Sequence, residues 1–279
     1  MIKRFVILIV SVLCLLSCKD DFTPPSKKAS VVVEGYIETN QLAKVFLTFP
    51  FSLDDEIGES SYQNFINSYA KVVVSSETER EVLTFKKDDN LIPPYYYSSS
   101  LLVGEAGKTY RLEVIFRGDT ITAVATIPQN EVEIDSIWCE PIENDSVHRN
   151  LYISFDKANP QAVSYYKFYT RTQSQKTFYP IKNSTLSDET YEPQITVGMH
   201  AGAENVVDTS TTSYFSLGDT VTIKAATIDA ESGQFWLLYD NETEYNNPFS
   251  NGSNLPSNIN GGLGVWTGMN SVRKQIVVQ

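Results

Sequence analysis

The sequence predicts a mainly β protein with two immunoglobulin- or fibronectin-like β-sandwich domains, the second with one packed helix and a long C-terminal loop. Three observations favour this fold class. Short runs that alternate apolar and polar residues recur along the chain, turn residues separate them, and β-branched and aromatic residues, including 16 tyrosines, fill them. About seven such runs within roughly a hundred residues are typical of a sandwich.

The first 17 residues predict an export signal. Lys3 and Arg4 precede an almost wholly apolar run over residues 5–16, which is too short to span a bilayer comfortably, and small Ser17 stands before Cys18. Residues 15–18, Leu-Leu-Ser-Cys, resemble a bacterial lipobox, which implies that Cys18 becomes the acylated first mature residue. At roughly 0.8 kcal/mol per buried CH2, several acyl chains would hold the protein on a membrane. The alternatives are an ordinary signal peptide cleaved near Cys18 and an N-terminal transmembrane anchor.

Residues 18–30 are expected to form a flexible tether, because they are charged, contain prolines and lack periodicity. Lys19, Asp20 and Asp21 resemble the charged surface-export signal of Bacteroidota lipoproteins. This resemblance implies a lipid-anchored outer-membrane protein that faces the cell exterior. Alternatively, the two aspartates only begin a solvated tether.

The N-terminal sandwich domain is expected over residues 31–128. Its first strand, 31–38, places Val31, Val33 and Ile37 on one face, with the more polar residues on the other. Further strands are predicted over residues 44–49, 71–75, 80–85, 109–116 and 120–126. The acidic run 54–59 lacks the alternating oxygen ligands of a calcium loop, so a solvated loop is favoured there.

A domain boundary is predicted at Gln129–Asn130, followed by a β-rich C-terminal domain over residues 131–279. Strands are predicted over residues 133–138, 151–155, 163–172 and 218–222. A helix is predicted near 229–244, because Asp229 can cap it and Phe235, Leu238 and Tyr239 recur at helical spacing. Residues 246–264 follow as a long loop rich in Asn, Pro, Ser and Gly, and such loops are often functional.

Composition argues against several classes of function. The net charge is -12 and the Lys and Arg residues are scattered, which argues against nucleic-acid binding. Cys139 would be the only non-acylated cysteine of the mature chain and is expected to be a small core residue. His148 and His200 have no neighbours at metal-ligand spacing, and no serine-hydrolase elbow is present. We therefore expect no enzyme activity, no metal and no cofactor.

Several segments, taken in order, carry a family resemblance. They are the lipobox with residues 19–21, and residues 33–37, 70–74, 107–112, 165–168, 235–236, 247–249 and 258–266, the last ending Gly-Gly-Leu-Gly-Val-Trp. Together they resemble the Bacteroidota lipoprotein family catalogued as domain of unknown function 4249. The resemblance implies an outer-membrane lipoprotein that works beside a TonB-dependent transporter importing glycans or peptides. It supplies no catalytic residues.

A second resemblance concerns glycosylation. Thr120, Ser146 and Thr220 each follow an aspartate and precede an apolar residue, as in the O-glycan acceptor sites of exported Bacteroidota proteins. These three positions are therefore expected O-glycosylation sites. The alternative is that strands simply begin this way without any sugar.

The function expected from these features is a binding or accessory subunit of a TonB-dependent (SusC-like) nutrient uptake system, with a glycan or peptide ligand. A surface adhesin or structural module is the alternative, and a polymer-degrading enzyme is a third reading. Phe249 and Trp266, in and beside the long loop, are the expected contact residues, because aromatic rings suit sugar or peptide capture.

Overall fold

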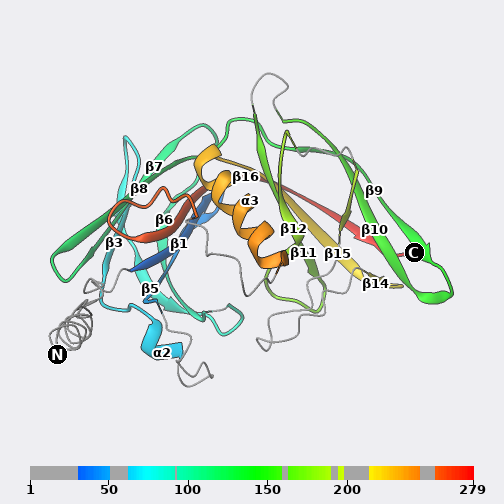
Figure 1. Cartoon of the computed structure of the whole chain (residues 1–279), viewed down its shortest axis with the longest axis horizontal. Coiled ribbons are helices and arrows are strands. Elements are labelled where there is room, and N and C mark those ends of the chain that lie inside the picture. The colour runs from blue at the N-terminus through cyan, green and yellow to red at the C-terminus, as the bar shows by residue number, and fades with distance from the viewer. Residues whose placement is uncertain are drawn as a thin grey trace, which may run out of the picture. The chain divides into compact units, whose positions relative to one another are not determined.

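Strands dominate the computed structural model, as the sequence predicts (Figure 1). The structure describes residues 31–50, 62–91, 93–158, 163–189, 194–197, 214–245 and 255–279. The predicted export signal, Cys18, the tether with Lys19, Asp20 and Asp21, and the contact residue Phe249 lie outside these residues. No helix among the described residues is long and apolar enough to cross a membrane.

An eight-stranded sheet forms the frame of residues 31–279. Its strands, in sheet order, are β12 (Tyr179–Ser187), β11 (Tyr165–Thr172), β15 (Thr220–Ile228), β16 (Leu263–Val277), β1 (Val32–Glu38), β2 (Leu42–Thr48), β6 (Tyr95–Val103) and β5 (Thr84–Lys87). The sheet therefore contains strands from both halves of the chain.

A four-stranded sheet packs against the N-terminal part of this frame. It consists of β4 (Arg80–Val82), β3 (Lys71–Ser75), β7 (Thr109–Phe116) and β8 (Asp119–Thr126). The short helix α2 (Tyr62–Phe65) precedes β3. Val33 and Ile37 of β1 are 0% exposed and share a core with Tyr110 and Leu112 of β7, so the predicted alternation along the first strand is confirmed.

A second four-stranded sheet packs against the C-terminal part. It consists of β13 (Gln194–Val197), β10 (Asp145–Asp156) and β14 (Phe215–Ser216), with β9 (Glu133–Ile142) paired to β10. Phe155 of β10 packs at 5.0 Å, centroid to centroid, against Phe168 of β11. Each half is thus a pair of sheets packed face to face over its own core, and the predicted mainly β sandwich class is confirmed.

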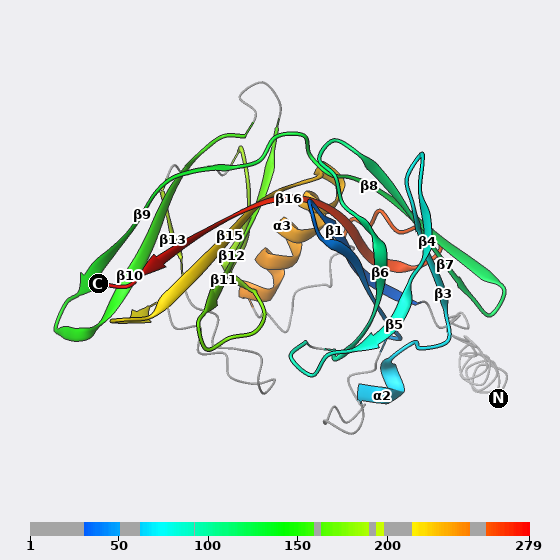
Figure 2. The ribbon, with the colours of Figure 1, turned by 180° about the vertical axis from the view of Figure 1, so that it is seen from behind.

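Strand β16 is long enough to serve both halves. It pairs in parallel with β1 from Val32↔Leu263 onward and in antiparallel with β15 as far as Thr220↔Val277. Figure 2 shows β16 in red running from one half to the other. Gly264 makes the close approach to β1 feasible, because its φ of 102° and the nearby Val33 carbonyl leave no room for a Cβ. The domain boundary at Gln129–Asn130 stays a prediction.

The predicted helix is confirmed as α3 (Ala230–Tyr245). Asp229 caps its N-terminus, because Oδ1 accepts a 3.0 Å hydrogen bond from the backbone N–H of Ser232. The other oxygen, Oδ2, accepts from the N–H of Gly268 on β16 at 2.8 Å, which ties the helix to the sheet. Gly233 faces the Tyr165 ring so closely that a Cβ would collide with it. This contact explains a glycine that costs helix stability.

Candidate functional site

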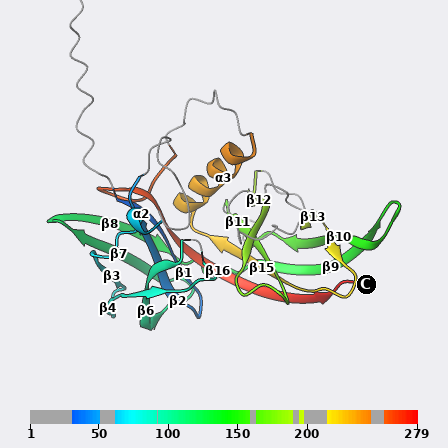
Figure 3. The same cartoon turned by 90° about the horizontal axis from the view of Figure 1, so that it is seen from below.

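A cleft of about 1040 Å³ lies between α3 and the face of the eight-stranded sheet that is turned away from the two sandwich cores. Figure 3 shows α3 on one side of β1, β16 and β15. Residues of β1 that alternate with the core positions, Glu34, Tyr36 and Glu38, line the floor. The polar face of the first strand, visible in the sequence, is therefore the floor of a cleft.

Aromatic side chains make up much of the cleft wall. They are Tyr36, Phe46, Tyr96, Tyr169, Phe178, Tyr179, Phe235, Trp236 and Tyr239. Phe46 and Tyr96, on neighbouring strands, lie 5.8 Å apart between ring centroids, and Trp236 and Tyr239 meet edge to face at 5.6 Å on the helix. Such a wall offers apolar faces together with hydroxyl groups, as small-molecule sites commonly do.

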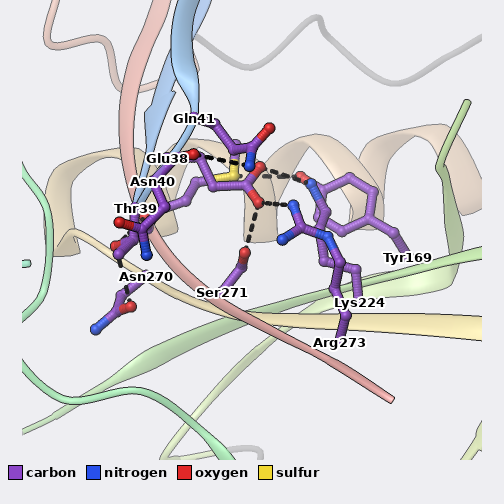
Figure 4. Close-up of polar contacts among 10 residues, drawn as sticks. Glu38, Thr39, Asn40, Gln41, Tyr169, Lys224, Asn270, Ser271 and Arg273 are labelled. Atoms are coloured by element: carbon purple, nitrogen blue, oxygen red, sulfur yellow. Dashed lines mark hydrogen bonds and ion pairs between the residues drawn. The ribbon is translucent and has the colours of Figure 1, made fainter. Parts of the chain in front are cut away.

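A buried ion cluster closes the cleft where the two halves meet (Figure 4). The Glu38 cluster consists of Glu38 on β1, Lys224 on β15, and Ser271 and Arg273 on β16. Lys224 Nζ donates to Glu38 Oε2 at 3.1 Å, Ser271 Oγ donates to Oε1 at 2.5 Å, and Arg273 donates to Oε1 as well. Glu38 is only 3% exposed and Lys224 only 6%, so this carboxylate joins strands from both sandwiches while almost fully buried.

The Glu38 cluster holds one carboxylate, that of Glu38, and two cations, Lys224 and Arg273. Burial opposes the Glu38 carboxylate, but Lys224, Ser271 and Arg273 together outweigh it and hold the pKa of Glu38 below its usual value. Lys224 lies near one carboxylate, that of Glu38, and near two further cations, Arg273 and Lys44. Burial and these like charges therefore lower the pKa of Lys224 in spite of its partner. The cluster has more positive than negative charge.

The helix is fixed over the cleft by a second polar cluster. Lys167 Nζ on β11 donates to Ser184 Oγ at 2.9 Å, lies 3.9 Å from Asp240 Oδ2 on α3, and sits 4.2 Å from the centroid of the Trp236 ring. Asp240 accepts in turn from the backbone N–H of Thr185 at 2.8 Å. Burial lowers the pKa of Lys167 to about 8, with partial compensation by Asp240.

Three other charged side chains in the cleft, those of Glu34, Lys44 and Arg171, have no ion pair within the described part of the chain. Glu34 is exposed to water within the cleft, and among the described residues it has no hydrogen bond or ion pair. Protein nevertheless surrounds it, and this enclosure raises the pKa of Glu34, with Lys167 acting against the rise. Lys44 lies 5.3 Å from the Tyr96 ring centroid and Arg171 lies 4.7 Å from that of Phe178. Neither cation has an ion pair among the described residues.

Trp266, one of the two expected contact residues, requires a correction. It is 0% exposed, belongs to the N-terminal core, and donates its Nε1 hydrogen to the carbonyl oxygen of Tyr110 at 3.2 Å. A ligand cannot reach this ring, because β16 carries it into the sandwich. The sequence showed an aromatic residue beside a loop, but the parallel pairing of β16 with β1 turns that residue inward.

The structure locates the other expected sites but does not test their roles. Thr120 and Ser146 are exposed and Thr220 is half-buried, each at or next to the start of its strand, and their glycosylation stays a prediction. Cys139 packs against the C-terminal core, and burial raises the pKa of its thiol. No group of three or more His, Cys, Asp or Glu that could hold a metal ion occurs among the described residues.

Sequence reasoning missed the cleft residues, although a signal was present. Lys224 stands inside the apolar run of β15, and Lys167 and Arg171 alternate with buried residues along β11. A charged residue inside an otherwise apolar strand is rarely buried without a partner. The two strands could therefore have been read as contributors to a polar site.

Comparisons with known proteins identify one family and return matches among solved structures. A family model described as "Domain of unknown function (DUF4249)" matches residues 19–275. None of the curated proteins matches. The crystal structure of the chicken CNTN1 FN1-FN3 domains is 12% identical, with a TM-score of 0.23, and the match covers 71% of this chain and 60% of that chain.

Proposed function

We propose that this chain, which belongs to the DUF4249 family over residues 19–275, is a membrane-anchored binding protein that captures a ligand in the cleft under α3. It serves as an accessory subunit of a TonB-dependent transporter on the outer membrane and faces the cell exterior. The lipid on Cys18 anchors it, and residues 18–30 let the folded part reach its partner.

The cleft is the observation that carries this proposal. Its volume of about 1040 Å³ is at the upper end of the range for small-molecule sites, which run to roughly 1,000 Å³. Its wall combines aromatic faces with charged groups, and its roof is held by Lys167, Asp240 and the cap at Asp229. A structural module has no need for a prepared hollow of this kind.

The carboxylates of the cleft favour binding over hydrolysis. Most glycoside hydrolases use two cooperating carboxyl groups. Glu38 and Asp240 are both held by cations, which leaves Glu34 as the open carboxylate of the described lining. This arrangement supports a protein that holds its ligand without cleaving it.

Three measurements on protein extracted from membranes in detergent test the proposal. Affinity purification is expected to recover a TonB-dependent transporter with the wild-type protein, and less of it with Cys18→Ser, which cannot be acylated. A binding screen against glycans and peptides is expected to return at least one ligand. Recovery of the protein alone, together with a screen in which nothing binds, would refute the proposal. Intact mass of the mature N-terminus checks the acyl chains on Cys18.

A further inference from the structure

The cleft is positive although the protein is negative. Among the described residues, seven Lys and Arg line it against three carboxylates, Glu34, Glu38 and Asp240, whereas the whole chain has a formal net charge of -12. Cations gathered in a low-dielectric hollow concentrate the field and attract anions, even when the rest of the surface is acidic. The charge of the cleft is therefore opposite to the charge of its surroundings.

The excess positive charge is only partly neutralised within the protein, by Asp88, which lies outside the lining and attracts Lys44 and Lys176. Glu38 serves both Lys224 and Arg273, and Lys44 adds a third cation close enough to lower the pKa of Lys224. Across the cleft, Arg171 stacks on Phe178 without a carboxylate partner among the described residues. The two buried cations, Lys167 and Lys224, already have carboxylate partners, whereas Lys44 and Arg171 are half-buried and have no ion pair among the described residues. An anionic ligand would supply the missing partner.

The form of the floor argues for a saccharide over an extended peptide. The floor is the face of a sheet whose backbone N–H and C=O groups are already used in the ladders of β1, β2 and β16. At β1, β2 and β16 the floor offers no free sheet edge for pairing with a peptide backbone, because the edges of this sheet are β5 and β12, at the two ends of the lining. Recognition must come from side chains. Aromatic rings such as Trp236 can stack on the apolar face of a sugar ring, and the open carboxylate of Glu34 can accept hydrogen bonds from sugar hydroxyls.

We propose that the cleft binds an anionic saccharide, with its carboxylate or sulfate groups near Lys44 and Arg171 and its rings against the aromatic wall. This inference rests on the proposed function and narrows its ligand to one chemical class. Acidity of the sugar is the essential part, since it is what the excess cations recognise.

Isothermal titration of the purified protein tests the inference. The probes are oligogalacturonates, sulfated oligosaccharides, the methyl-esterified and desulfated forms of each as neutral counterparts, and acidic peptides. At least one acidic saccharide is expected to bind, its neutral counterpart much more weakly, and the affinity should fall with added salt. Lys44→Gln and Arg171→Gln should each weaken binding about tenfold or more, since each removes a charged hydrogen-bond donor.

Lys71→Gln is the matched control, because Lys71 is exposed on β3 and does not line the cleft. It should leave binding unchanged. Thermal unfolding of each variant shows whether it is folded, and Lys44→Gln should be, because burial already disfavours the charge it removes. Equal binding of neutral and acidic saccharides, or binding of acidic peptides alone, would overturn the inference and leave the proposed function intact. Binding of none of these probes would overturn the inference, and the affinity purification and the broader binding screen would then decide the proposed function.

Discussion

Replacing Glu38 with Gln removes the carboxylate that holds Lys224, Ser271 and Arg273 together, while keeping the size of the side chain. In the wild type, Glu38 is 3% exposed and accepts from all three residues, which come from two strands of the C-terminal half. Gln retains a carbonyl oxygen for one donor. It leaves two cations facing each other without a negative charge.

The stability cost of Glu38→Gln comes from Lys224 and Arg273, which stay in place without their carboxylate. Breaking a buried ion pair by removing one partner costs about 3–5 kcal/mol, because the remaining charge is uncompensated. Lys224 already has a lowered pKa and can lose its proton, so the lower end, about 3 kcal/mol, is expected. In a chain of this size each kcal/mol shifts the melting temperature by about 2–4 °C, which gives a fall of roughly 6–12 °C.

Urea unfolding at neutral pH measures this cost, and Glu113→Gln is the matched control. Glu113 pairs with Arg80 at 3.2 Å on the surface, where the two side chains are 28% and 61% exposed, so its loss should cost no more than about 1 kcal/mol. The folded-state pKa of Glu38 is lowered, so its contribution is present above about pH 4.5 and is lost as the pH falls through that lowered pKa. Equal costs for the two variants at neutral pH would refute the reasoning.

Three further predictions concern Trp266, Gly264 and Lys167. Trp266→Ala should lower the free energy of unfolding by about 3–5 kcal/mol in urea, because it empties a core position and removes the hydrogen bond from Nε1 to the Tyr110 carbonyl; a loss below about 1 kcal/mol would contradict the burial. Gly264→Ala should destabilise by at least about 1 kcal/mol more than Gly218→Ala, because both have positive φ but only Gly264 meets nearby backbone; equal thermal shifts would argue against that close approach. Lys167 has a folded pKa of about 8 against 10.5, so the unfolded chain holds an extra proton between these values and stability should gain a rising contribution with pH there; a Lys167→Met variant with the same slope would exclude Lys167 as its source.

Local features of the fold could be predicted from the sequence. Alternation along the first strand identified Val33 and Ile37 as core residues, and the cap at Asp229 with helical spacing identified α3 to within a residue or two. These features depend on neighbours in sequence, which is why pattern alone reveals them. The sandwich class followed from the number and spacing of the strands.

Long-range pairing could not be predicted in this way. The parallel contact of β1 with β16 joins residues more than 200 positions apart, from Val32↔Leu263 to Glu38↔Met269, and no local pattern encodes it. That pairing buries Trp266 and brings Glu38 to Lys224, so the core position of one and the ion pair of the other both depend on it. The cleft was hidden for the same reason, since its floor and roof come from strands and a helix that are distant in sequence.

A crystal structure of the protein with the tightest ligand from the binding screen tests the central claim most directly. Ligand density is expected between α3 and the face of β1 and β2, with an anionic group within hydrogen-bond distance of Lys44 or Arg171 and a ring against the aromatic wall. Ligand density elsewhere on the protein, with the cleft empty, would contradict it.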